Sequence, residues 1–473
     1  MEATLPISAT VRPAARAIKP IAAAAPSISL PLSFILTGLA ALVAGFAWLV
    51  AEPTLLTTYH YNQNIIALTH LLVLGWICSV VMGAMYQLVP VALETKLYSE
   101  RLAKWQFALH VIGFVGMVWM FKTWNMKQVG HFGSVLALGV GLFVYNLTRT
   151  LLRVPKWNIV ATGIASSLGW FSVTVLAGLS IAAGKCTYDS TDGVAVAGGV
   201  RTLVGGLRAV GMFMSRFDAI GAMHAHAHLG FLGLFTMLII GVSYKLVPMF
   251  TLSEIQNRWR ARLSVMLLNA GLLGAFISIL LRSPWKAFFA LVICAALAVY
   301  GWEIIAIVRA RKRATLDWGV KGFLTALGML VPLSALAGVL AWPGLPLNVF
   351  TGQLENLYGF LGLIGFVTFA IFGMLHKIIP FLVWFHSYSP HVGRSQVPTL
   401  AELYSERLQV IGYWTWLAAL ATASAGILAQ NQTVERVGAL GLTATLALFA
   451  VNVGKMLSHV LYPKLKPLSV ITK

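Results

Sequence analysis

The sequence predicts an all-α membrane protein in which twelve transmembrane helices form three repeated four-helix units. Two observations predict the helices. Of the 473 residues 59% are hydrophobic and only 10% are charged, against about 25% charged in an average soluble protein. Apolar runs of about 20 residues, the length of a membrane-spanning helix, recur along the whole chain. A third observation, a motif repeated with identical spacing in three of these runs, predicts the units.

The expected spans follow the apolar runs in order. They cover residues 31–51, 65–91, 104–122, 131–151, 159–184, 219–250, 262–282, 285–308, 319–342, 355–384, 408–428 and 434–461. Glycines and charges interrupt the pattern between 185 and 218. Residues 1–28 are rich in alanine and proline and lack the apolar core of a signal peptide, which predicts a flexible cytoplasmic tail. Residues 29–473 are then a single membrane domain.

The basic residues predict the orientation. A net charge of +20 does not indicate nucleic acid here, because Lys and Arg of membrane proteins collect in cytoplasmic loops. With the N-terminus inside, 22 of the 34 Lys and Arg lie on the inner side, 9 on the outer side and 3 within spans. We therefore expect a multi-pass protein of a bacterial inner membrane with both termini in the cytoplasm. The three cysteines form no C-x-x-C motif, so neither disulfides nor covalently attached haem are indicated.

One motif recurs in the second, sixth and tenth spans, with its members at offsets 5, 13, 16, 17 and 20 from the first. The copies are His70, Gly75, Gly83, Tyr86, Gln87, Pro90; His228, Gly233, Gly241, Tyr244, Lys245, Pro248; and Phe360, Gly365, Gly373, His376, Lys377, Pro380. The segment LYSERL also occurs twice, after the second and the tenth spans. The repeat predicts four-helix units that start near residues 65, 219 and 355, with the first span completing the third unit. Its glycines let helices or a flat cofactor approach closely.

Three histidines, His224, His226 and His228, alternate at the start of the sixth span. Ionisable groups inside a bilayer are costly and by default mark a functional site. At about 100° per residue, His224 and His228 share one helix face and His226 points nearly the opposite way. All three therefore cannot hold one metal ion. Either His224 and His228 share a metal, or His226 and His228 serve two sites on opposite sides of the helix.

The repeat makes His70 the equivalent of His228, which favours ligation over an ordinary interhelical hydrogen bond for these two residues. For other polar residues the simpler expectation is structural. We expect packing or interfacial roles for His110 and His131, interhelical hydrogen bonds for Tyr86 and Tyr244, and solvent or cytoplasmic exposure for His60, His386, His391, His459 and Glu303.

Twelve spans in three pseudo-repeats, with histidines in the outer part of the second and sixth spans, resemble subunit I of the heme–copper oxidase superfamily. The local sequence is most similar to cbb3-type oxidases and nitric oxide reductases. His226-Ala-His228, followed by Gly233, Tyr244 and Pro248, resembles the His-x-His signature of the family's tenth span.

The resemblance implies haem, of b-type, and possibly copper. By position, His70 would be an axial haem ligand and His228 a copper ligand. By motif, His226 and His228 would each ligate a haem. Both alignments remain open. The resemblance also implies an electron donor, either a cytochrome c, a cupredoxin or quinol, and other respiratory subunits as partners.

Two departures put a complete oxygen-reducing centre in doubt. The seventh span lacks the His-His pair of the family's copper site, and Tyr358-Gly-Phe360 stands where His-x-His is expected in the tenth span. We therefore expect a membrane haem-binding redox protein with an incomplete binuclear centre, and with oxygen or nitric oxide as the acceptor. The alternatives are a haem- and copper-containing membrane protein of the nitric-oxide response, and a metal-handling transporter with His224 and His228 as a way-station.

Overall fold

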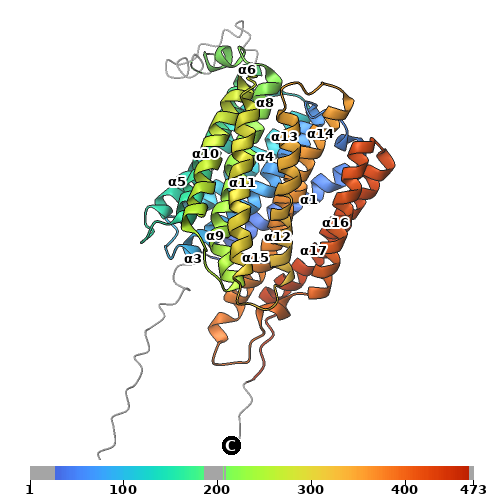
Figure 1. The fold of residues 1–473 in the computed structure, drawn as a ribbon. Helices are drawn as coiled ribbons and strands as arrows, with labels where there is room; N and C mark the ends of the chain where they lie inside the picture. Colours follow the sequence, from blue (N-terminus) through green and yellow to red (C-terminus); the bar gives the residue numbers. More distant parts are fainter. Residues whose placement is uncertain (1–26, 186–205, 207–208, 468–473) are drawn as a thin grey trace, which may run out of the picture.

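The computed structural model describes residues 27–185, 206 and 209–467. The described part is helical throughout, and twelve of its helices are long and apolar enough to cross a membrane, as predicted. They lie lengthwise beside one another in one bundle (Figure 1). Most of the predicted tail, residues 1–26, and Cys186 lie outside the described residues.

Eight of the twelve spans are single, uninterrupted helices. They are α1 (Ser29–Ala51), α4 (Glu100–Lys122), α5 (Met126–Leu151), α6 (Ile159–Lys185), α10 (Arg258–Leu280), α11 (Lys286–Arg309), α16 (Glu406–Ala429) and α17 (Gln432–Leu461). The ninth span is divided into α12 (Trp318–Gly328) and α13 (Leu330–Ala341). Short 3₁₀ turns, η2 (Pro53–Leu56), η6 (Ser389–His391) and η7 (Leu400–Leu403), lie in the connections.

The three remaining spans, the second, sixth and tenth, are the most buried of the twelve. Each contains an eight-residue π-helical segment between two α-helices. The second is α2 (Gln63–His70), η3 (Leu71–Cys78) and α3 (Ser79–Ala92); the sixth is α8 (Ala219–His228), η4 (Leu229–Thr236) and α9 (Met237–Thr251); the tenth is α14 (Val349–Phe360), η5 (Leu361–Thr368) and α15 (Phe369–Ser387). The π segments start directly after His70, His228 and Phe360, the first residues of the three motif copies. The sequence repeat is therefore also a repeat of backbone conformation.

Helix packing follows the same threefold pattern. The most extensive pairs are α4 with α5, α10 with α11, and α16 with α17, which are equivalent in the three units. The last span of each unit packs on the inner helix of the next: α6 packs on α9, and α12 packs on α15. Because α1 packs on α3 in the same way, the first span takes the last place in the third unit, as expected. The tenth span joins the other two inner helices: Trp76 Nε1 donates to Thr368 Oγ1 at 3.1 Å, and Phe231 packs on Phe366.

The repeated glycine at offset 13 explains how closely these helices approach. A Cβ atom on Gly83 would lie 2.9 Å from the Pro31 carbonyl oxygen of α1. On Gly241 it would lie 2.9 Å from Gly163 Cα of α6, and on Gly373 2.7 Å from the Gly319 carbonyl oxygen of α12. In each unit the inner helix thus rests backbone against backbone on the preceding span, which only glycine permits.

A second repeated contact joins the loop after each inner helix to the third helix of its unit. Asn146 accepts from the Ser99 N–H at 3.0 Å and donates to the Ser99 carbonyl, and Asn452 holds Ser405 in the same way. In the second unit a carboxylate takes this place. Glu303 Oε1 accepts from the N–H groups of Gln256 and Asn257, at 2.7 and 2.8 Å.

The expectation that Glu303 faces the cytoplasm is therefore wrong. Its side chain is fully buried and forms an ion pair of 2.7 Å with Arg260. Its position near a helix end made solvent exposure the simple expectation, but the adjacent loop folds back over the carboxylate.

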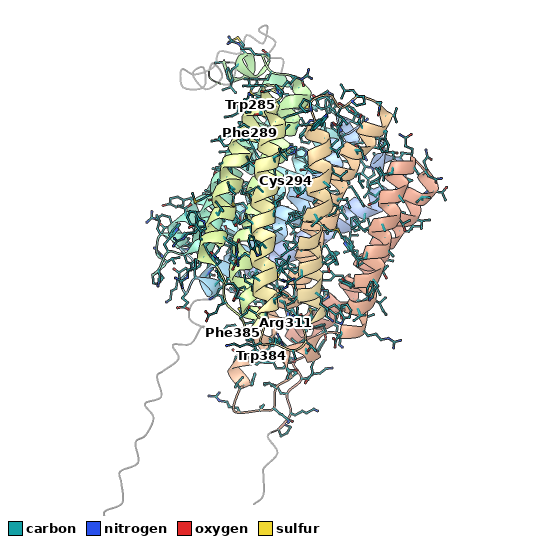
Figure 2. All side chains as sticks on the ribbon, viewed as in Figure 1. Trp285, Phe289, Cys294, Arg311, Trp384 and Phe385 are labelled. Carbon is teal, nitrogen blue, oxygen red and sulfur yellow. The ribbon has the colours of Figure 1, made fainter. Side chains whose placement is uncertain are left out.

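The ends of the bundle differ in chemistry. Figure 2 shows Trp285 and Arg311 at opposite ends of α11, with Trp384 and Phe385 at the Arg311 end. Trp285 is largely exposed, as tryptophans at a membrane interface are. Arg311 belongs to the densest cluster of basic residues in the chain. The labels of α8 and α14 lie toward the Trp285 end (Figure 1), so the histidines of α8 lie in the half of the bundle away from this basic cluster.

Candidate functional site

His70 and His228 have the same conformation at equivalent positions. His70 Nδ1 lies 2.7 Å from the Ile66 carbonyl oxygen, and His228 Nδ1 lies 2.8 Å from that of His224. A carbonyl oxygen can only accept, so in each ring Nδ1 carries the proton and Nε2 keeps a free lone pair. A backbone carbonyl fixes metal-ligating histidines in this way. Both rings are half-buried, beside Phe121 and Tyr358 respectively.

His226 points toward the preceding unit. Its ring lies against Gly178 of α6. A Cβ atom on Gly178 would lie 3.0 Å from the imidazole Cε1, so this glycine makes room for the ring. His226 Nδ1 is buried without a hydrogen-bond partner. His226 therefore lies against α6, whereas the His228 ring lies against Tyr358 of α14.

His224 meets two residues that sequence reasoning did not select. Its Nε2 lies 2.9 Å from Nε2 of His60, which precedes the second span, and His60 Nδ1 lies 3.5 Å from Glu355 Oε2 of α14. The expectation that His60 is solvated is wrong: its side chain is 18% exposed, and burial lowers its pKa, which favours the neutral imidazole. One signal could have indicated Glu355, because a carboxylate inside an apolar run is rare.

The surroundings of His228 contain no second histidine in the positions that the sequence comparison singled out. Tyr358 stacks on the His228 ring with centroids 5.9 Å apart, and Phe360 is buried at the third motif position. The seventh span, α10, has no histidine, and its inward polar side chains include Ser264 and Asn269. Among the described residues, the group of three or more His, Cys, Asp or Glu close enough to share a metal ion is His60, His224 and Glu355.

A separate cavity of about 40 Å³ lies in the third unit, between α12, α15, α16 and α17. It arises where the motif has His376 in place of a tyrosine. Tyr86 bridges to Gln106 and Tyr244 to Ser264, which are the expected interhelical hydrogen bonds. The shorter His376 leaves a space. The cavity is lined by buried polar atoms without partners: His376 Nε2, both amide atoms of Gln409, and Trp416 Nε1.

Three further histidines have structural or surface positions, while His386 is exposed, as expected, and His391 is partly exposed. His110 is fully buried and lies 2.9 Å from Ser79 Oγ, so it packs between helices as expected, and His131 is exposed. His459 is buried and lies 2.6 Å from Tyr388 Oη. The expectation that His459 is solvated is wrong, because the chain after the last helix folds back: the Lys464 N–H donates to the same tyrosine.

Comparison with known proteins gives a consistent result. Residues 20–126 match the family model of cytochrome c and quinol oxidase polypeptide I. The fold is similar to a heme–copper terminal oxidase dimer determined by cryo-EM, with a TM-score of 0.65 and 12% sequence identity over 93% of this chain and 85% of that chain. No curated protein matches the sequence.

The fold of this chain is therefore that of a heme–copper terminal oxidase subunit, and its first quarter also matches the sequence model of polypeptide I. The solved structure is by name a heme–copper oxidase, so haem and copper are the two groups against which the residues of this chain are compared. At the positions that the sequence singled out, the donor atoms of this chain fit haem better than copper. Two histidines, His70 and His228, present a free Nε2 and a fixed Nδ1–H, which is the chemistry of an axial haem ligand. A three-histidine copper site at the family's positions does not fit, since α10 supplies no imidazole.

Proposed function

We propose that this protein is a haem-binding membrane redox protein related to the heme–copper oxidases, in which His70 and His228 are axial ligands and the binuclear centre is incomplete. The observation that carries the proposal is the shared conformation of the two rings at equivalent repeat positions, each directly before a π segment. π-helical segments inside α-helices are frequent at functional sites. Haem, when bound, supplies one-electron chemistry, and the residues of the chain hold and orient it.

The chain's own residues divide this work. The carbonyls of Ile66 and His224 hold the Nδ1 protons, so that Nε2 of His70 and of His228 is available to iron without loss of a proton. Phe121 and Tyr358 pack on the two rings and keep water away from them. His226, whose buried Nδ1 has no hydrogen-bond partner, is the third candidate. The proposal includes the alternative in which His226 ligates a second haem.

The donor and the acceptor follow from the family alone. We propose that a cytochrome c, a cupredoxin or quinol supplies electrons, that oxygen or nitric oxide accepts them, and that other respiratory subunits accompany the chain in a bacterial inner membrane with both termini in the cytoplasm. A haem- and copper-containing protein of the nitric-oxide response shares this site and differs in the acceptor. A copper ion on His224 and His228, as the sequence suggests, would need Nε2 of both rings.

Transport receives less support from the structure than from the sequence. A transporter can use cationic side chains within its spans, such as Lys245 and Lys377 here. Lys377, however, forms an ion pair of 2.6 Å with Asp317 at the start of α12. Lys245 is exposed on the surface of its helix. Neither cation lies free in a buried pathway, so we prefer the redox function.

The test is the optical spectrum of the purified protein. The wild type is expected to show a Soret band that shifts on reduction with dithionite. His70→Ala and His228→Ala are each expected to lose or change it, while the exposed His131→Ala leaves it unchanged. A wild-type protein that stays colourless after haem supplementation, or that keeps an unchanged spectrum in both variants, would contradict the proposal.

A further inference from the structure

The side chains of His60, His224 and Glu355 converge from three separate parts of the fold. His60 lies in the connection before α2, His224 on the second turn of α8, and Glu355 on α14. One donor atom from each lies within 4.8 Å of the others. The cluster therefore joins the three repeat units on one side of the bundle, and it uses neither of the Nε2 atoms assigned above to haem.

Hydrogen bonding alone leaves this cluster under-satisfied. Between the facing Nε2 atoms of His60 and His224, 2.9 Å apart, only one hydrogen bond can form. His60 Nδ1 is buried and has no hydrogen-bond partner, because Glu355 Oε2 is 3.5 Å away. Two neutral imidazoles beside a half-buried carboxylate therefore leave some of their lone pairs without a hydrogen-bond donor.

The spacing suits a small divalent ion. Zinc–nitrogen and zinc–oxygen distances of about 2.0–2.2 Å place tetrahedral ligand atoms about 3.4 Å apart. In the cluster, Nε2 of His60 and Nε2 of His224 lie 2.9 Å apart, and one donor atom from each of the three residues lies within 4.8 Å of the others. Small rotations of the side chains are sufficient to bring one atom of each residue onto a shared ion. Tyr59, half exposed beside His60, marks the side open to water, which can supply a fourth ligand.

The donor set selects the ion. Two imidazoles and one carboxylate, without a thiolate or thioether, suit zinc or copper(II); calcium and magnesium require more oxygen ligands, and copper(I) prefers sulfur. The nearby charged side chains are Lys286, which influences both His224 and Glu355, and Asp218, which is itself paired with Arg282. The coordinating carboxylate then supplies the local negative charge.

We propose that His60, His224 and Glu355 form a binding site for one borderline divalent transition-metal ion, zinc or copper(II), separate from the haem ligands. The site ties the loop before the second span to the sixth and tenth spans, so occupancy holds the three units together at this end. The proposal does not rest on haem binding.

The experiment titrates copper(II) into the full chain in detergent, after tag removal and EDTA treatment. Electron paramagnetic resonance is expected to show one type of copper(II) per chain with hyperfine splitting from two imidazole nitrogens. His60→Ala and Glu355→Gln are expected to weaken binding about 10-fold or more, since removing a metal-site residue commonly costs about 10–100-fold. His131→Ala, which removes an exposed histidine, serves as the matched control and leaves the affinity unchanged.

Two outcomes would overturn the proposal. One is a wild-type protein without a stoichiometric copper signal or a zinc-binding isotherm in calorimetry. The other is an affinity in His60→Ala equal to that in His131→Ala. The Soret band of the same samples separates this test from the haem proposal, because loss of haem in His70→Ala is expected to leave copper binding intact.

Discussion

At the scale of single residues, Glu303 is the buried charge on which the second unit depends. It accepts two backbone N–H groups and pairs with Arg260. Glu303→Ala leaves all three donors without a partner, and we expect a loss of about 3 kcal/mol in stability. Glu303→Gln keeps a carbonyl acceptor and should cost less. Thermal unfolding in detergent measures both, and an alanine variant as stable as the wild type would show that the loop has another anchor.

Asp218 gives the chain a pH dependence at the start of α8. Its carboxylate accepts from the Gly221 N–H at 2.7 Å and pairs with Arg282 at 2.7 Å. These contacts lower its pKa below the ordinary value of 3.8, mainly through the Gly221 hydrogen bond. Because the folded pKa is the lower one, the stabilisation is complete above the unfolded pKa and is lost as the pH falls through the folded value.

We therefore expect the unfolding midpoints of the wild type and of Asp218→Asn to differ at neutral pH and to converge below about pH 4. Asparagine is a suitable control because it still caps a helix but cannot titrate. Unfolding curves across this pH range measure the difference. A difference that stays constant with pH would contradict the assignment to Asp218.

The candidate site was only partly predictable at this scale. The repeat spacing singled out His70 and His228, because equivalent positions in a local pattern are visible in the chain itself. The meeting of His60, His224 and Glu355 was not predictable, since it depends on how three distant segments pack. The burial of Glu303 and His459 was missed for the same reason: each is covered by a loop that folds back.

At the scale of helices, the contacts of Gly241 and Gly412 predict opposite effects of the same substitution. Both glycines are buried. A Cβ atom on Gly241 would lie 2.9 Å from Gly163 Cα, whereas on Gly412 its nearest neighbour is Thr445 Cγ2 at 3.8 Å. Gly241→Ala should lose about 1–3 kcal/mol by overpacking, and Gly412→Ala should gain up to about 1 kcal/mol of helix propensity.

Unfolding midpoints of these two variants, measured together, test the backbone contact between α6 and α9. Equal midpoints would mean that α6 and α9 can move apart to admit the added methyl group without loss of stability. The close approach itself was predicted from the repeated glycines. The π segments were not, because the apolar residues of η3, η4 and η5 have no pattern that distinguishes a π-helix from a buried α-helix.

At the scale of the whole molecule, the twelve spans and the three units were predicted and are confirmed. Hydrophobic run length and repeat spacing are local properties, so they can be recognised in a sequence that is only 12% identical to a solved structure of similar fold. The cavity at His376 was not expected. His376 Nε2 is as free as that of His70, but a cavity of about 40 Å³ admits only a few water molecules.

We therefore expect His376→Ala to keep its haem, with ordered water seen beside Gln409 and Trp416 in a high-resolution experimental structure. Loss of haem in this variant would indicate that haem binds at His376 in the third unit and not at His70 and His228. Haem extracted from the variant and from the wild type, compared per chain, measures the difference.

The central claim is that His70 and His228 hold the haem of this chain. The most direct test is the haem content per chain, determined as the pyridine haemochrome, in the wild type, His70→Ala, His228→Ala and the double variant. The account predicts haem in the wild type, a reduced content in each single variant, and none in the double variant. A double variant that retains the wild-type haem content would contradict it.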